Sequence, residues 1–126
     1  MKFKNDVIFT GRLQAKELKD VIGSALALTY IPYFEGFGIP LLEAMNCDVP
    51  VITSDVTSMP EIAKDAALLI DPFSVDSIAN AMILLYKDEN KRIELINKGR
   101  QRKLDFSWDK TANALWESIE KTVNNK

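Results

Sequence analysis

The chain of 126 residues contains no histidine and a single cysteine, Cys47. Without histidine it lacks the commonest acid–base group and metal ligand at neutral pH, so we expect no metal centre. One cysteine allows no internal disulfide, which is typical of a protein from a reducing compartment. Because Cys47 ends an apolar segment, we expect it to pack as a small side chain and not to act as a nucleophile.

Long apolar runs and an excess of positive charge are also missing. No run approaches the ~20 apolar residues of a membrane span, and the N-terminal MKFKNDV lacks the apolar core of a signal peptide. The formal net charge is −2, and the aromatic residues are not interleaved with the basic ones. We therefore expect a cytoplasmic protein and exclude nucleic acid as a partner.

Strand-like and helix-like segments alternate along the chain. Length and a hydrophobic content of 47% suit one domain with one core. Apolar runs predict four strands, at residues 7–10, 25–31, 49–53 and 67–70, and helical patterns cover about 14–24, 40–46, 75–87, 90–103 and 107–123. This alternation predicts an α/β fold with a parallel sheet of about four strands flanked by helices.

Details of the C-terminal helices can also be predicted. Ser74 is expected to cap the helix at 75–87, whose stripe of Ile78, Ala81, Met82 and Leu85 should cover the sheet. Trp108 and Trp116 are expected to anchor the last helix by packing.

The segment EGFGIPLLEAM, residues 35–45, joins a predicted strand to a predicted helix. Gly36 and Gly38 allow positive φ and close approach of a ligand. Pro40 suits the first turn of a helix, where its missing N–H costs nothing. We expect Glu43 in that first turn and Glu35 in the loop before it. A helix N-terminus therefore faces the glycine loop, with a carboxylate on either side.

This arrangement suits a nucleotide-sugar. The free amides and positive dipole end of the helix favour phosphate. Two carboxylates do not favour a phosphate, so they are better used as acceptors for the hydroxyls of a ribose or hexose. The spacing of two glutamates is a weak signal by itself, and the glycine loop, the proline and the flanking strands supply the specificity.

The same segment, followed by VPVI at 49–52, resembles the signature E-G-F-G-L-P-x-x-E-A-M-A-x-G-x-P-V-I of retaining glycosyltransferases of the fourth family, which have the two-domain, Rossmann-like GT-B architecture. FTG at 9–11, SMPE at 58–61, AALLIDP at 66–72 and FSW at 106–108 resemble further landmarks in family order. Ile31-Pro32 stands where the family has Pro-Ser, and Asp48 replaces a glycine. Aspartate tolerates left-handed backbone, so the helix exit can keep its geometry.

The resemblance implies transfer of a sugar from a nucleotide diphosphate sugar to an acceptor hydroxyl with retention, without cofactor or required metal. Its implied catalytic residue is Glu35, which would hold donor-sugar hydroxyls near the reacting carbon. Its implied donor-binding residues are Gly36, Phe37, Gly38, Ile39 and Glu43. Glu43 would hold the ribose diol. Independently of the resemblance, Arg12 and Leu13 follow the carboxyl end of strand 7–10, where ligands bind in open α/β sheets, and we expect Leu13 to bind the donor by contacting the nucleotide base.

The family's C-terminal domain has six parallel strands, two more than this sequence predicts. We therefore expect residues 1–126 to form a single domain, the nucleotide-sugar-binding C-terminal domain without its first two strand–helix units. The N-terminal acceptor-binding domain would be a missing partner, and the isolated chain would be inactive. In the family's sheet, the two missing strands lie between the strands that correspond to 7–10 and 25–31. Without them, we expect strand 7–10 to dock directly beside strand 25–31. The alternative is an open edge.

Basic residues gather on the predicted helix at 90–103 and at the end of the helix before it, namely Lys87, Lys91, Arg92, Lys98, Arg100, Arg102 and Lys103. Interleaved acids favour a solvated helix face. The second interpretation is a contact with the cytoplasmic membrane surface, because many enzymes of the resembled kind act on lipid-linked acceptors.

Other functions stay open. A non-catalytic module that binds a nucleotide-sugar or a protein would require a natural gene product of this length, which the flanking DNA would reveal. An epimerase or phosphorylase of the same architecture is disfavoured, because its acid–base residues or its lysine-bound cofactor cannot be placed. A dinucleotide dehydrogenase is disfavoured by the lack of G-x-G-x-x-G after the first strand.

Overall fold

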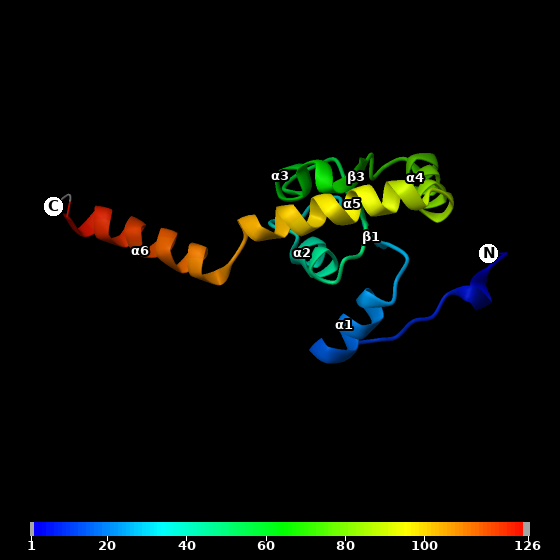
Figure 1. Cartoon of the computed structure of the whole chain (residues 1–126), viewed down its shortest axis with the longest axis horizontal. Helices are drawn as coiled ribbons and strands as arrows, with labels where there is room; N and C mark the ends of the chain where they lie inside the picture. Colours follow the sequence, from blue (N-terminus) through cyan, green and yellow to red (C-terminus); the bar gives the residue numbers. More distant parts are fainter. Residues whose placement is uncertain (1, 125–126) are drawn as a thin grey trace.

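A computed structural model describes residues 2–124 and has an α/β architecture (Figure 1). Its elements are η1 Lys4–Asp6, α1 Ala15–Gly23, β1 Leu28–Tyr30, α2 Ile39–Asn46, β2 Val51–Ser54, α3 Met59–Ala63, η2 Lys64–Ala66, β3 Ala67–Ile70, α4 Val75–Lys87, α5 Glu89–Arg102, η3 Lys103–Asp105 and α6 Trp108–Asn124. The strands form a parallel sheet in the order β1-β2-β3, with Leu28 opposite Val51 and Val51 opposite Ala67. The expected fold class is thereby confirmed.

The helices begin where side chains can satisfy their first amides. The backbone N–H of Gln14 donates to the Glu17 carboxylate at 2.8 Å, as part of a capping box at the start of α1. The Ser74 hydroxyl accepts from the Ser77 amide at 3.1 Å, so the predicted cap of α4 is confirmed. Asp88 caps α5 in the same way, with 2.9 Å to the Lys91 amide.

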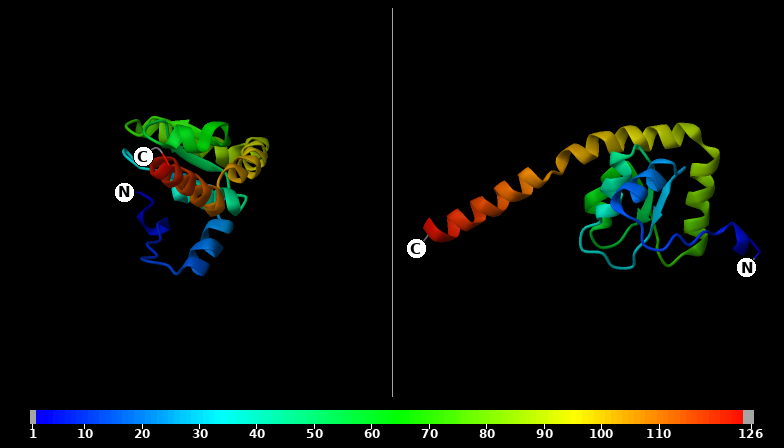
Figure 2. Two further views of the ribbon diagram at one scale, coloured as in Figure 1. Left: turned by 90° about the vertical axis from the view of Figure 1, so that its left-hand side faces the viewer. Right: turned by 90° about the horizontal axis from the view of Figure 1, so that it is seen from below.

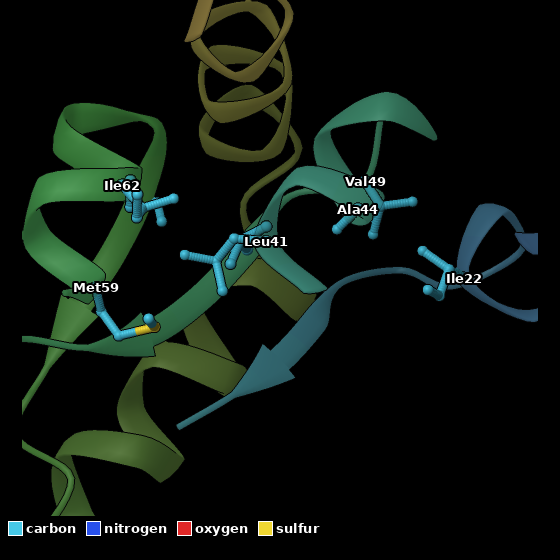
Figure 3. Packing of buried hydrophobic residues seen from close by; sticks show 9 residues of the cluster. Ile22, Leu41, Ala44, Val49, Met59 and Ile62 are labelled. Atoms are coloured by element: carbon cyan, nitrogen blue, oxygen red, sulfur yellow. The ribbon is translucent and has the colours of Figure 1, made fainter. Parts of the chain in front are cut away.

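The sheet carries an apolar cluster on each face, and its central strand β2 is completely buried. On one face Val51 packs with residues of α1, α2 and α3 (Figure 3). On the other face Ile52 packs with Leu85 of α4 and Leu95 of α5. Burial on both faces explains why β2 shows no alternation of buried and exposed residues: Val51 and Ile52 are adjacent, apolar and both buried. Of the stripe expected to cover the sheet from α4, Ala81 and Leu85 are buried, whereas Met82 is exposed.

Helix α5 packs against α2 and against η2, which leads into β3 (Figure 2). A Cβ on Gly99 would lie 3.1 Å from Met45 Cγ, so the two helices approach closely at this glycine. Arg100 makes a two-pronged ion pair with Asp48, which has φ +58° and stands at the expected left-handed exit of α2.

The expected first strand does not form. Residues 7–10 lie extended and exposed, the sheet has three strands and not four, and β1 has an open edge. An apolar cavity of about 560 Å³ lies along this edge, between β1 and α4, and Leu26, Ala27, Met82, Ile83 and Tyr86 help to line it. Direct docking was the wrong prediction. Helix α1, the one element described between residues 7–10 and β1, does not bring residues 7–10 back to the edge of β1.

Helix α6 projects from the body of the domain (Figures 1 and 2). Trp108 is 83% exposed and Trp116 is 61% exposed, so the expectation that they anchor the helix by packing was wrong. Helix α6 does carry an apolar stripe along one side, but none of its residues is buried by another part of residues 2–124. Within the same residues, no helix combines the length and the apolar character needed to cross a bilayer.

Candidate functional site

The loop of residues 31–38 follows β1 at the carboxyl edge of the sheet and leads into α2. Gly38 is the N-cap residue of α2, with φ +104° and ψ +46°, a conformation that strongly favours glycine. A Cβ at Gly38 would lie 2.6 Å from Met59 Cε, so space also requires glycine. Gly36 was expected to share the positive φ, but it does not, and open space surrounds it.

The start of α2 presents backbone donors to the loop. Pro40 occupies the first turn, as predicted, and contributes no N–H. The Leu41 amide donates to the Gly38 carbonyl at 3.0 Å. Among residues 2–124, no protein acceptor pairs with the amides of Gly38 and Ile39. These two donors, at the positive end of the helix dipole, can bind an anionic group.

Glu35 lies in this loop and is half-buried. The Tyr30 hydroxyl donates to its Oε2 atom at 2.6 Å, and the Phe37 amide lies 3.5 Å from its Oε1 atom. The hydrogen bond from Tyr30, followed by those from the amides of Phe37 and Gly36, holds the pKa of Glu35 below its usual value. Glu35 is therefore a carboxylate at neutral pH, able to accept hydrogen bonds from a ligand.

Ser58, at the start of α3, holds the backbone of the loop. Its hydroxyl lies 2.8 Å from the carbonyl oxygen of Glu35 and 3.2 Å from that of Phe37. These two carbonyls flank Gly36, so a single side chain ties down the tip of the loop. Phe37 directs its ring away to an edge-on contact with Phe106, which leaves its backbone as the part that can meet a ligand.

Glu43 lies further along α2 than expected. Because the helix begins at Ile39, Glu43 is its fifth residue and falls in the second turn. Its half-buried side chain lines a cavity of about 370 Å³ between α1 and α2, together with Ala15, Leu18 and Ile22. Glu35 is not among the residues lining this cavity. The two carboxylates therefore serve different surroundings, one beside α1 and one beside β1.

Leu13, expected to contact the nucleotide base, is partly buried and lies two residues before Ala15 of the same cavity. Ile39 is 52% exposed beside the glycine cap. Among residues 2–124, no group of three or more potential metal ligands comes together.

Sequence reasoning missed three features of this edge of the sheet. Tyr30 and its contact with Glu35 were not anticipated, and Ser58 was noticed only as part of a landmark. Thr53 and Ser54, at the carboxyl end of β2, have fully buried hydroxyls without a hydrogen-bond partner among residues 2–124. Polar residues at the end of a buried central strand were the signal that could have drawn attention to this position.

The fold and the loop define the class: a parallel α/β domain whose candidate site lies beyond the carboxyl ends of its strands. The family model of the glycosyl transferases group 1 matches residues 1–102. The chain therefore belongs to the glycosyl transferases group 1 family, as the motifs predicted.

Relatives and a solved structure agree with this assignment. The chain is 37% identical to O-antigen chain mannosyltransferase B of Escherichia coli over 101 aligned residues. This alignment covers 80% of the chain and 26% of the relative. It is 39% identical over 72 residues to O-antigen chain mannosyltransferase RfbU of Salmonella typhimurium, covering 57% of the chain and 20% of the relative. Sucrose-phosphate synthase from Thermosynechococcus elongatus matches with a TM-score of 0.85 at 25% identity, over 99% of the chain and 32% of that protein. The chain thus spans about a quarter of the length of its first relative.

Proposed function

We propose that the chain is the donor-binding part of a retaining glycosyltransferase, which transfers a hexose from a nucleotide diphosphate sugar to an acceptor hydroxyl. The observation that carries the proposal is the start of α2, where the unpaired amides of Gly38 and Ile39 lie between Glu35 and Glu43 in the sequence. Amides at a helix N-terminus suit the diphosphate, and carboxylates suit sugar hydroxyls. The mannosyltransferase names of two relatives favour a hexose donor.

Different residues would bind different parts of the donor. Glu43, in the cavity beside α1, would accept both hydroxyls of the ribose, with the base toward Leu13. Glu35 would accept hydroxyls of the transferred sugar near its anomeric carbon. The backbone of Phe37, Gly38 and Ile39 would face the sugar and the diphosphate.

In the reaction, the bond between the anomeric carbon and the diphosphate oxygen breaks, and the acceptor oxygen bonds to the same face of that carbon. The proton of the acceptor hydroxyl passes to the leaving diphosphate. The leaving diphosphate gains negative charge as this happens. The unpaired amides at the start of α2 would stabilise that charge, because they are already fixed in place by the helix.

We further propose that this domain works with parts of the enzyme outside residues 1–126. These would be an acceptor-binding domain and two strand–helix units that complete the donor domain. The quarter of a relative's length that the chain spans supports this. So do the open edge of β1 and the apolar cavity beside it, since such an edge is normally paired or covered.

The test compares nucleotide-sugar binding by the full-length enzyme and by its variants Glu35→Ala and Glu43→Ala. Calorimetric titration with UDP-, GDP- and ADP-sugars identifies the donor. Each variant should weaken binding of that donor by about 10-fold or more, because each removes an acceptor for charge-assisted hydrogen bonds. Glu61→Ala is the matched control, since Glu61 is an exposed acid in the first turn of the nearby α3. Unchanged binding by both variants would refute the proposed site.

The chain of residues 1–126 alone should show negligible transfer and weak or no donor binding. Turnover by the purified chain at the rate of an intact enzyme, typically about 1–1000 per second, would contradict the division of the site between this domain and the rest.

A peripheral position on the cytoplasmic membrane face is a further part of the proposal. Several basic residues of α5 bind within the domain, for example Arg92 to the Leu85 carbonyl and Arg102 to the Ile62 carbonyl. Lys91 and Lys98 pair with Glu94, and Arg100 pairs with Asp48. Membrane contact would therefore depend mainly on Lys87, the exposed last residue of α4. Sedimentation of the full-length enzyme with anionic but not neutral vesicles is the expected result, and equal recovery with both would remove this part of the proposal.

A further inference from the structure

Tyr30 is the last residue of β1, directly before the loop that forms the candidate site. It lies opposite Thr53 of β2 in the parallel register and is half-buried against the cluster that contains Leu41 and Met59. Packing and strand pairing thus fix the ring before the loop begins. Its hydroxyl reaches Glu35, five residues further on, and donates to Oε2 at 2.6 Å.

This contact leaves the two oxygens of the Glu35 carboxylate in different states. Oε2 is held by Tyr30 at 2.6 Å, whereas Oε1 lies 3.5 Å from the Phe37 amide, the limit of a hydrogen bond. The Gly36 amide adds a smaller stabilisation of the carboxylate than either of these donors. A carboxylate held through one oxygen cannot rotate freely, and its other oxygen keeps its acceptor capacity. Ser58 fixes the same residue through the backbone, at 2.8 Å from the Glu35 carbonyl oxygen.

We propose that Tyr30 is a positioning residue for Glu35: its hydroxyl fixes Oε2, so that Oε1 points to a hydroxyl of the donor sugar. The assignment rests on the proposed function, in which Glu35 binds that sugar. A rigidly held acceptor loses less conformational freedom when ligand binds, and small displacements of a catalytic group are costly in rate.

The choice of tyrosine also has a chemical reason. A phenol donates a hydrogen bond without bringing a positive charge, so Glu35 keeps its full negative charge for the ligand. Lysine or arginine at this position would compete with the sugar for the carboxylate. The hydrogen bond with Glu35, followed by burial, raises the pKa of Tyr30, so the phenol keeps its proton at neutral pH.

The first experiment uses the chain of residues 1–126 and needs no donor. Carbon-detected NMR follows the titration of the Glu35 carboxyl carbon in the natural chain and in Tyr30→Phe, which keeps the ring and removes the hydroxyl. The pKa of Glu35 should rise in this variant because its largest stabilising contact is lost. Tyr33→Phe is the control, because Tyr33 belongs to the same loop but stacks on Phe73, with 4.9 Å between ring centroids. Equal Glu35 titrations in the natural chain and Tyr30→Phe would overturn the inference.

The second experiment measures kinetics of the full-length enzyme. Tyr30→Phe should lower kcat about 10-fold, with a smaller change in donor KM, and should move the acid limb of the pH–rate profile upward. The same substitution in a Glu35→Gln background should have little further effect, because the partner is already gone. Unchanged kcat and pH profile in Tyr30→Phe would overturn the positioning role, as would equal effects of Tyr30→Phe with and without Glu35.

The two proposals fail differently in these kinetics. If Glu35→Gln itself leaves kcat and donor binding unchanged, the proposed function of Glu35 is refuted, and the inference falls with it. If Glu35→Gln is impaired but Tyr30→Phe matches the natural enzyme, only the positioning role is refuted. Circular dichroism melting confirms that each variant is folded at the assay temperature.

Discussion

Gly38 is the position where a single methyl group should do the most damage to the candidate site. Gly38→Ala places a residue with a Cβ at φ +104°, which costs about 1–3 kcal/mol. The new Cβ would also lie 2.6 Å from Met59 Cε and 3.3 Å from its sulfur. Met59 is flexible but fully buried, so its displacement costs about 1 kcal/mol or more. Alanine restricts the unfolded chain and offsets about 0.4–1 kcal/mol.

The net expectation for Gly38→Ala is a loss of about 2–3 kcal/mol in the free energy of unfolding, or roughly 10 °C in Tm. Urea and thermal unfolding of the chain, followed by circular dichroism, measure both. Gly36→Ala is the matched control, because Gly36 has no positive φ and no atom within 4 Å of a new Cβ. It should change stability by no more than about 0.5 kcal/mol. Equal stabilities of the two variants would refute the argument that the cap requires glycine.

Three further substitutions test other contacts. Ser58→Ala should cost about 1 kcal/mol and speed amide hydrogen exchange in the loop around Glu35, and unchanged exchange would mean that the hydroxyl does not hold the loop. Gly99→Val should cost about 1–3 kcal/mol by urea unfolding, since even a Cβ there lies 3.1 Å from Met45 Cγ, and full stability would show that α5 and α2 are not in close contact. Hydrogen bonds from Lys91 and Lys98 lower the pKa of Glu94 to about 2. The contribution of these ion pairs to stability is therefore complete above about pH 4.5 and is lost as the pH falls toward 2. Glu94→Gln should therefore flatten the decline of stability over this interval, and an unchanged decline would contradict the ion pairs.

Local patterns predicted the helices well. The range of α4 and its cap at Ser74 were both correct, because periodicity and capping depend on residues within a few positions of one another. The start of α2 beside Pro40 was predicted for the same reason. Glu43 was placed one turn too early, because the helix begins at Ile39, before the proline.

Contacts between distant segments were the part that sequence could not supply. Residues 7–10 have the composition of a strand, but a strand also needs a neighbouring edge, and no local pattern reports one. Trp108 and Trp116 were expected to pack, yet an amphipathic stripe indicates only which face of a helix is apolar and not what covers it. The contact of Tyr30 with Glu35 depends on the path of the loop, although the two residues are close in sequence.

The central claim is that one side of the α2 start holds a nucleotide and the other holds its sugar. A crystal structure of the full-length enzyme with its nucleotide diphosphate sugar tests it most directly. The account predicts the diphosphate on the amides of Gly38 and Ile39, the ribose hydroxyls on Glu43 and hydroxyls of the transferred sugar on Glu35. A donor bound elsewhere, with both carboxylates free of it, would contradict the account.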